Sequence, residues 1–216
     1  MTQIKLNIKI IKSHQLEEAA HCHMSAFPNS FTTKLGISYV IKMLEWYIIS
    51  EDRFLLGVVS GEKVVGYVGG AKGYGSTSGM LQYAYWQGFI AILSRPYLFL
   101  NLTLLSHIRL ISRNIAKRLF ISMEKSSLSA EKIQQESSNK ISIGLVVLGV
   151  HQKFRRKGIG SMLLKAFNDN CLKIGCNKGH LTVKVSNIAA IEAYKKNSWK
   201  IIQSNKKFTY LEVEIC

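Results

Sequence analysis

The chain has 216 residues, of which 47% are hydrophobic, 19% are charged and only two are proline. This composition excludes a disordered protein, and the length suits one domain, 1–216, that contains a large insertion. The formal net charge of +16 favours anionic partners such as nucleic acid, phosphorylated cofactors or a membrane surface, although a general bias toward lysine would also explain much of it.

The four cysteines predict neither a disulfide framework nor a metal site. Cys22, Cys171, Cys176 and Cys216 lack paired C-x-x-C spacing, and no close pair of Cys or His is matched by a second pair. The start of the sequence alternates apolar and polar residues, whereas a secretion signal needs an uninterrupted apolar run. We therefore expect reduced thiols, no bound metal and a cytoplasmic location.

The first third of the chain predicts a strand, two helices and a β-hairpin, in that order. Residues 4–10 alternate apolar and polar side chains, which is typical of a half-buried strand. Helical spacing follows over 14–27 and 34–50. Two short β-rich runs, 53–60 and 63–71, are joined by a Gly-Glu pair and predict a tight hairpin.

Residues 72–140 differ in composition and are predicted to form a helical and polar insertion. An apolar and aromatic run covers 81–120, and a polar stretch follows it. Arg95 and Pro96 divide the run into pieces that are shorter than the roughly 20 apolar residues of a membrane span. We expect helices that cover an acceptor site, pair with a second copy of the chain, or contact a membrane surface.

The C-terminal third alternates strands and helices, as α/β proteins do. Residues 141–150 form a β-branched run that is typical of a strand buried on both faces, and helical spacing follows from about 158 to 174. A strand at 180–185, a helix at 187–197 and two strands around 199–204 and 208–215 complete the pattern.

The segment RRKGIG, residues 155–160, lies between a predicted buried strand and a predicted helix. The first N–H groups of a helix have no partners within it and lie at the positive end of its dipole, so such a turn binds anions. Gly158 and Gly160 allow a phosphate to approach the backbone, and the three basic residues add attraction. The spacing excludes a P-loop, and Leu163 stands where a dinucleotide fingerprint needs its third glycine.

The same segment resembles the acyl-CoA-binding turn of the GNAT superfamily of N-acyltransferases, whose pattern is [QR]-x-x-G-x-[GA]. Arg155, Gly158 and Gly160 match that pattern. The run from Asn187 to Trp199 is similar to N-x-x-A-x-x-x-Y-x-x-x-G-[FW] of the same superfamily. On a helix, the spacings within this run place its tyrosine on the inward face.

The resemblance implies a mixed α/β fold with a central mixed sheet of about seven strands, flanked by helices, and a helical insertion between the third and fourth strands. It also implies acetyl transfer from acetyl-CoA to a primary amine, without a metal. Residues 26–48 resemble a bacterial subgroup with a similar insertion that is linked to surface-polysaccharide functions. This favours an amino sugar or a nucleotide-linked amino sugar as the acceptor.

The resemblance also assigns the site residues by position. Tyr194 would be the general acid, because a phenol with a reference pKa of about 10 suits a thiolate leaving group. The backbone N–H near Val150 would polarise the thioester carbonyl, and Asn187 would hold the pantetheine arm or a water near the sulfur. The predicted coenzyme A contacts are Leu148, Gly149, Val150, Arg155, Arg156, Lys157, Gly158, Ile159, Gly160, Ser161 and Asn187. The alternative for Tyr194 is a core position with a locally bonded hydroxyl.

Two positions depart from the family pattern. Related sequences with an insertion often have a glutamate early in the fourth strand, where this chain has Gly144. The general base is therefore open among His151, Glu124, His23 and an ordered water chain. Ser198 replaces the usual glycine before the aromatic residue.

A competing interpretation retains the fold without strong activity. The basic, aromatic insertion would then bind nucleic acid or a membrane surface. Because the sequence contains no strong nucleic-acid recognition motif, we predict instead an enzyme that uses acetyl-CoA and a small amine acceptor.

Overall fold

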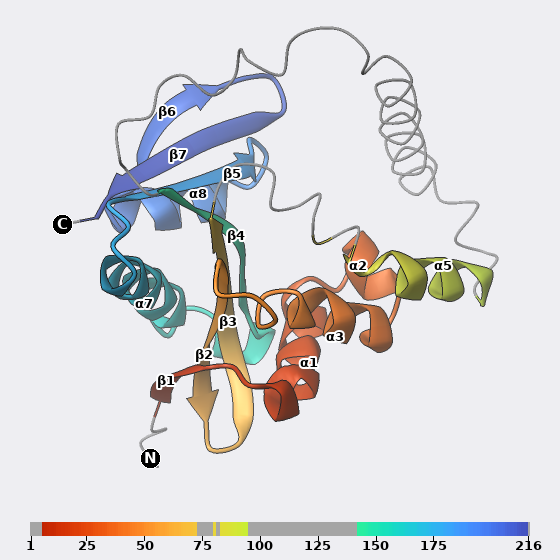
Figure 1. Cartoon of the computed structure of the whole chain (residues 1–216). Coiled ribbons are helices and arrows are strands. Elements are labelled where there is room, and N and C mark those ends of the chain that lie inside the picture. The colour runs from red at the N-terminus through yellow and green to blue at the C-terminus, as the bar shows by residue number, and fades with distance from the viewer. Residues whose placement is uncertain (1–5, 73–79, 81–82, 95–141, 216) are drawn as a thin grey trace, which may run out of the picture. The chain divides into compact units, whose positions relative to one another are not determined.

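A computed structural model describes residues 6–72, 80, 83–94 and 142–215 (Figure 1). The chain divides into two compact units, one formed by Met1–Gly88 with Lys140–Cys216 and the other by Phe89–Asn139. Most of the predicted insertion, including Glu124, lies outside the described residues, so its bounds and purpose stay predictions. No helix in the described part of the chain has both the length and the apolarity that a bilayer span needs.

The first unit is built on a seven-stranded sheet with the strand order β1-β2-β3-β4-β5-β7-β6. The strands are β1 (Leu6–Ile10), β2 (Arg53–Ser60), β3 (Lys63–Lys72), β4 (Ser142–Val150), β5 (Lys178–Lys184), β6 (Lys200–Ser204) and β7 (Phe208–Glu214). The helices are α1 (Leu16–Ala26), α2 (Phe31–Lys34), α3 (Ile37–Glu45), α5 (Tyr85–Leu93), α7 (Ile159–Lys173) and α8 (Ile188–Lys196), with short 3-10 turns η1 (Ser13–Gln15) and η3 (Gln152–Phe154). The prediction of a mixed α/β fold with about seven strands and flanking helices is confirmed.

Strands β4 and β5 form the parallel pair of the sheet, and the other neighbouring strands are antiparallel. A parallel pair needs a long crossover connection, which α7 supplies. The predicted hairpin of β2 and β3 turns at Gly61, whose φ of 63° is readily adopted only by glycine.

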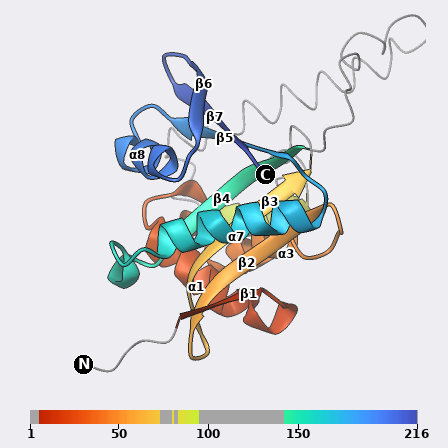
Figure 2. The same ribbon diagram turned by 90° about the vertical axis from the view of Figure 1, so that its left-hand side faces the viewer.

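The two faces of the sheet are covered by different helices (Figures 1 and 2). Helix α7 packs on one face, where its side chains form the main core with Ile143 and Leu145 of β4. Helix α1 packs on the opposite face against β3 and β4, and α3 packs against α1. A Cβ atom at Gly149 would contact the rings of Tyr67 and Phe27, which places that residue on the α1 face.

Two sequence predictions about local structure were wrong in detail. The helix expected over 34–50 is the shorter α3, which begins after Gly36, whose φ of 94° is not helical, and ends at Glu45. The first strand is less buried than its alternation indicated, with Ile8 44% and Ile10 63% exposed. Among the described strands it lies at the edge of the sheet, with β2 as its neighbour.

Candidate active site

Strands β4 and β5 pair over a short distance and then diverge. Their paired residues are Ser142 with Lys178, Ile143 with Gly179, and Gly144 with His180. Beyond these pairs, in the described structure, β4 has only β3 as a neighbour and β5 has only β7. The divergence leaves two facing backbone edges without ladder partners, and an extended ligand with amide groups could bind to them.

A bulge in β4 lies at the start of this opening. The register between β3 and β4 shifts so that Gly70 pairs with Leu145 and Gly69 with Val147, which leaves Val146 opposite no residue of β3. A bulge bends a strand and changes the direction of its side chains. Leu148 and Val150, after the bulge, therefore face the α7 core as Leu145 does before it. The sequence predicted a β4 that is buried on both faces, yet 146–148 are half-exposed where β5 has diverged.

The outer end of the opening is the turn that leads into α7. Helix α7 begins after Gly158, and its first internal hydrogen bond runs from the Met162 N–H to the Gly158 carbonyl. The N–H groups of Ile159, Gly160 and Ser161 precede that bond. Among the described residues, no side chain caps this helix end and no acidic residue lies in its first turn. The three N–H groups and the helix dipole therefore form a site for an anion.

The backbone of this turn is tightly folded and open to the outside. Gly158 has a φ of 78° and Arg156 a φ of 59°, both in the left-handed region. A Cβ atom at Gly158 or at Gly160 would meet no other atom within 4 Å. A phosphate group could therefore approach the amides without displacing a side chain.

The three basic residues before the glycines differ in their contacts. The Arg155 guanidinium donates to the Ala26 carbonyl at 2.7 Å and to the Val150 carbonyl at 3.4 Å, so it ties the end of β4 to α1. The Lys157 ammonium lies 5.1 Å from the centre of the Phe154 ring, and Arg156 is exposed. These contacts favour a positioning role for Arg155, while Arg156 and Lys157 supply positive charge at the surface.

Helix α8 places Tyr194 on the α7 side of the opening. The Asn187 Oδ1 accepts a hydrogen bond from the Ala190 N–H at 3.3 Å and caps the start of this helix. The Tyr194 ring packs against the main core with its centre 5.9 Å from that of Trp199. Its ring therefore packs against the core, as the alternative from the sequence expected, and its role as general acid stays a prediction.

The chemistry of Tyr194 follows from its burial. Burial raises the pKa of Tyr194 to about 12. The phenol therefore stays protonated at neutral pH and can donate a proton or a hydrogen bond, although less readily than an ordinary tyrosine.

The turn that follows α8 places Ser198 at a φ of 69°, in the left-handed region that favours glycine. This explains why the family pattern has glycine at that position.

Both histidines considered as bases, His23 and His151, have structural contacts. The ring nitrogens of His23 are hydrogen-bonded to the hydroxyls of Tyr67 and Thr32, and burial lowers the pKa of His23 to about 4. The Nδ1 atom of His151 accepts a hydrogen bond from the Lys153 N–H at 3.3 Å and caps η3. Both imidazoles therefore have structural hydrogen-bond partners.

The structure places His180, which the sequence did not single out, at the inner end of the opening between β4 and β5. His180 is the β5 partner of Gly144 in the last pair before the strands diverge. A Cβ atom at Gly144 would lie 3.0 Å from the His180 Nε2. In the sequence, the available indication was that His180 lies at the start of a predicted strand. Its proximity to Gly144 follows only from the register between β4 and β5.

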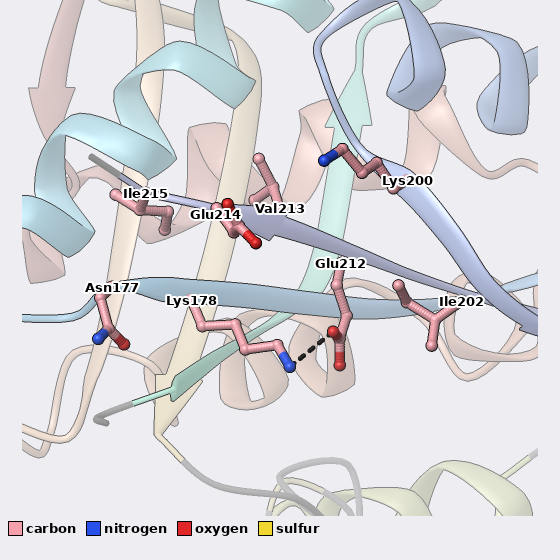
Figure 3. A pocket seen from close by; sticks show the side chains of 8 residues that line it. All are labelled: Asn177, Lys178, Lys200, Ile202, Glu212, Val213, Glu214 and Ile215. Atoms are coloured by element: carbon pink, nitrogen blue, oxygen red, sulfur yellow. Dashed lines mark ion pairs between the residues drawn. The ribbon is translucent and has the colours of Figure 1, made fainter. Parts of the chain in front are cut away.

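A surface pocket of about 350 Å³ lies over β5, β7 and β6 (Figure 3). It is lined by Asn177, Lys178, Lys200, Ile202, Glu212, Val213, Glu214 and Ile215. The Lys178 ammonium and the Glu212 carboxylate form an ion pair at 2.6 Å within it. Glu212 is also the β7 partner of His180, so the pocket is next to the inner end of the opening.

Across the described residues, no group of three or more His, Cys, Asp or Glu side chains could hold a metal ion.

Residues 130–199 match a protein-family model described as the acetyltransferase (GNAT) family. The matched region contains β4, the turn, α7, β5 and α8, and therefore every site residue predicted from the sequence. A search of curated proteins finds no match to the chain.

Solved structures with a similar fold include several N-acetyltransferases. The PaiA N-acetyltransferase of Thermoplasma acidophilum, in complex with coenzyme A, has a TM-score of 0.57 at 12% identity, covering 97% of this chain and 99% of its own. The ribosomal-protein-S18-alanine N-acetyltransferase of Escherichia coli has a TM-score of 0.53 at 13% identity, covering 98% and 94%. NAA60 of Arabidopsis thaliana, in complex with acetyl-CoA, has a TM-score of 0.55 at 15% identity, covering 98% and 99%.

These likenesses establish a GNAT-type fold that extends over nearly the whole chain. The match of residues 130–199 to the acetyltransferase family model is the comparison that bears on activity. These comparisons give no support to the interpretation of a nucleic-acid or membrane-surface binder.

Proposed function

We propose that this protein transfers the acetyl group of acetyl-CoA to the primary amine of a small acceptor, an amino sugar or a nucleotide-linked amino sugar. The observation that carries the activity is the opening between β4 and β5, which ends at the uncapped N-terminus of α7. The family match and the coenzyme A and acetyl-CoA complexes among the structural neighbours support the choice of co-substrate.

Coenzyme A would lie along β4. Its pyrophosphate would accept hydrogen bonds from the N–H groups of 159–161, with Arg156 and Lys157 nearby. Its pantetheine arm would extend inward along the free edge of β4, which spans about 20 Å from Val150 to Gly144 at about 3.3 Å per residue. The thioester would then lie toward the inner end, and an edge N–H between Leu145 and Val150 would polarise its carbonyl.

Positioning would supply most of the rate acceleration. Both reactants are held in one opening, and effective molarities for well-oriented groups reach about 10⁵ M or more. The amine attacks the thioester carbon, and the Tyr194 hydroxyl donates a proton to the departing sulfur. Asn187 caps α8 through its Oδ1, which leaves its amide nitrogen to face the arm or a water.

The pocket over β5, β7 and β6 suits an acceptor that has both an amine and an anionic group. Glu212 and Glu214 supply carboxylates that attract an ammonium, and Lys200 supplies a cation for a phosphate. An amino sugar phosphate or a nucleotide-linked amino sugar combines these two groups. A polyamine has only cationic groups and would meet a chain whose net charge is +16.

The test is an acceptor panel read by thiol release. The full chain is incubated with acetyl-CoA and glucosamine 6-phosphate, a nucleotide-linked amino sugar, spermidine, or a peptide with a free α-amino group. Coenzyme A is measured with a thiol reagent, and the acetylated product is identified by mass spectrometry. We expect the highest kcat/KM with an anionic amino sugar. Preference for the peptide or for spermidine would contradict the acceptor class, and the absence of acetyl-CoA binding would contradict the activity itself.

A further inference from the structure

We propose that His180 is the general base of the acetyl transfer and removes the proton from the acceptor amine at the inner end of the β4–β5 opening. This assignment rests on the proposed function. The sequence left the general base unassigned, because Gly144 stands where related sequences often have a glutamate. Three observations support His180 in that role: where its imidazole lies, which face of the sheet it occupies, and which charged groups surround it.

The imidazole lies at the junction of the two strands. Gly144 and His180 form the last pair before β4 and β5 diverge. A ligand that is anchored by its pyrophosphate at the start of α7 and extends inward along β4 has its reactive end toward this pair. A base at this junction is therefore within reach of an amine that attacks a thioester carbonyl held there.

The ring occupies the space that a side chain at position 144 would need. A Cβ atom at Gly144 would lie 3.0 Å from the His180 Nε2 and 3.6 Å from its Cδ2 and Cε1. Such a separation is tighter than ordinary van der Waals contact, so a carboxylate at 144 and an imidazole at 180 compete for one volume. The absence of a side chain at Gly144 thus makes room for the imidazole of His180, and β5 instead of β4 supplies the titratable group.

His180 lies on the opposite face of the sheet from Tyr194. Its neighbours on β5, Gly179 and Leu181, face the α7 core, because Leu181 belongs to that core and a Cβ at Gly179 would meet Phe167 and Trp199. Side chains alternate along a strand, so His180 faces the other side. A base and an acid on opposite sides of the opening suit a reaction in which the amine enters from one side and the sulfur leaves toward the other.

The surroundings keep the imidazole able to accept a proton. Burial lowers the pKa of His180, the Glu212 carboxylate on β7 opposes this change, and the Lys178 ammonium on β5 adds to it. Lys178 and Glu212 also form an ion pair, so each offsets part of the other's effect. The imidazole is therefore neutral at neutral pH, and its protonation would begin below the ordinary range of histidine.

The proposed step conserves atoms and charge. The amine lone pair forms the C–N bond and the carbonyl electrons move to oxygen. The extra proton on nitrogen passes to the Nε2 of His180. As the intermediate collapses, the C–S bond breaks and the sulfur takes the proton of the Tyr194 hydroxyl. The imidazolium then returns one proton to the phenolate through solvent, which leaves an amide and free coenzyme A.

The position of His180 is tested by nuclear magnetic resonance, without an acceptor. The imidazole signals of the full chain are recorded while acetyl-CoA is added, and the His180 signal is identified by its loss in His180→Gln. We expect this signal to shift as acetyl-CoA saturates the protein, while the signal of His21, which is exposed on α1, stays in place. Saturation by calorimetry without a shift at His180 would overturn the proposal. Failure to bind acetyl-CoA would instead contradict the proposed function.

The chemical role is tested by kinetics with the best acceptor of the panel. His180→Gln should lower kcat/KM by about 10²-fold to 10³-fold, as losses of general base catalysis do, without changing the Kd for acetyl-CoA. It should also remove the lower of the two ionisations that reduce kcat/KM at acidic pH, the higher one being that of the acceptor amine, whereas loss of a structural residue would leave both in place. His21→Gln is the matched control and should behave as the unmodified protein. An unaltered pH profile in His180→Gln would refute the base assignment.

A carboxylate placed in the vacated space provides the second kinetic test. In the double variant Gly144→Glu with His180→Gly, the ring no longer blocks position 144. We expect at least about 10-fold higher kcat/KM than in His180→Gly alone, since the new group can accept a proton from the same place. Equal activity of the double and single variants would count against the base role.

Discussion

The Asn197 side chain donates a hydrogen bond to the Ser161 Oγ at 3.2 Å, and a second one to the Ala193 carbonyl at 2.7 Å. Asn197 ends α8 and Ser161 lies in the first turn of α7. The bond therefore fixes the helix that holds Tyr194 to the turn that offers the anion site. The two sequence motifs, residues 155–160 and 187–199, are therefore held together in the structure. We expect changes in either motif to affect the same bound ligand.

We expect Gly160→Trp to weaken coenzyme A binding strongly without unfolding the protein. A Cβ atom at Gly160 meets nothing within 4 Å, so a side chain can leave the backbone there, and an indole would exclude a phosphate from the amides. The Kd measured by calorimetry should rise by about 10²-fold or more, which corresponds to about 2.7 kcal/mol. Lys165→Trp, at an exposed position of the same helix, is the control and should bind normally. Unchanged binding in Gly160→Trp would show that the pyrophosphate lies elsewhere.

We expect Tyr194→Phe to lower kcat by about 10²-fold with little change in the KM for acetyl-CoA, because it removes a proton donor and retains the packing of the ring. Tyr47→Phe makes the same change in a fully buried tyrosine, whose hydroxyl contacts Met80, and should retain kcat. Steady-state kinetics with the best acceptor measures both variants. If Tyr194→Phe has a normal kcat, its ring is only a part of the core.

We expect Ser198→Gly to stabilise the protein by about 0.5 kcal/mol. Ser198 has a φ of 69°, where a side chain costs about 1 kcal/mol or more, and the greater freedom of glycine in the unfolded chain offsets only part of that gain. The same substitution at Ser38, an exposed residue of α3, should destabilise by about 0.5 kcal/mol. Urea unfolding measures both, and equal signs would contradict the strain at Ser198.

We expect the stability of the protein to fall between about pH 6.5 and pH 4 because of His23. Its pKa falls from an ordinary 6.5 to about 4 in the folded state, so the unfolded state binds the proton more tightly. The contribution is complete above pH 6.5 and is lost as the pH approaches 4, by about 3 kcal/mol at most. Urea unfolding at several pH values measures the slope. His23→Gln should reduce the slope, and the exposed His21→Gln should leave it unchanged.

Local patterns predicted most of the framework. The hairpin of β2 and β3, the helix after Gly158 and the strand and helix around Tyr194 were all anticipated, since period, glycine positions and chain order are local signals. The turn that we propose as the anion site was predictable for the same reason, because a glycine-bearing turn between a strand and a helix fixes the direction of its amides.

The remaining features of the site depend on contacts between distant segments. Nothing near Arg155 in the sequence indicates that its guanidinium would reach the carbonyl of Ala26, which is 129 positions away. The proximity of His180 to Gly144 depends on the register of a parallel pair, and a shift of one residue would turn the histidine to the other face. Such relationships come from tertiary packing, so residue types and spacing alone could not supply them.

The short β4–β5 ladder also has a consequence for cohesion. In the described structure, the antiparallel group β1 to β4 and the group β5 to β7 are joined in the sheet by three residue pairs, and α7 packs against strands of both groups. A ligand bound between the free edges of β4 and β5 would contact both strands where they no longer pair with each other. Binding would thus stabilise the two groups of strands as one cooperative unit, by a free energy that rises with the logarithm of the ratio of ligand concentration to Kd, and product release would remove that stabilisation.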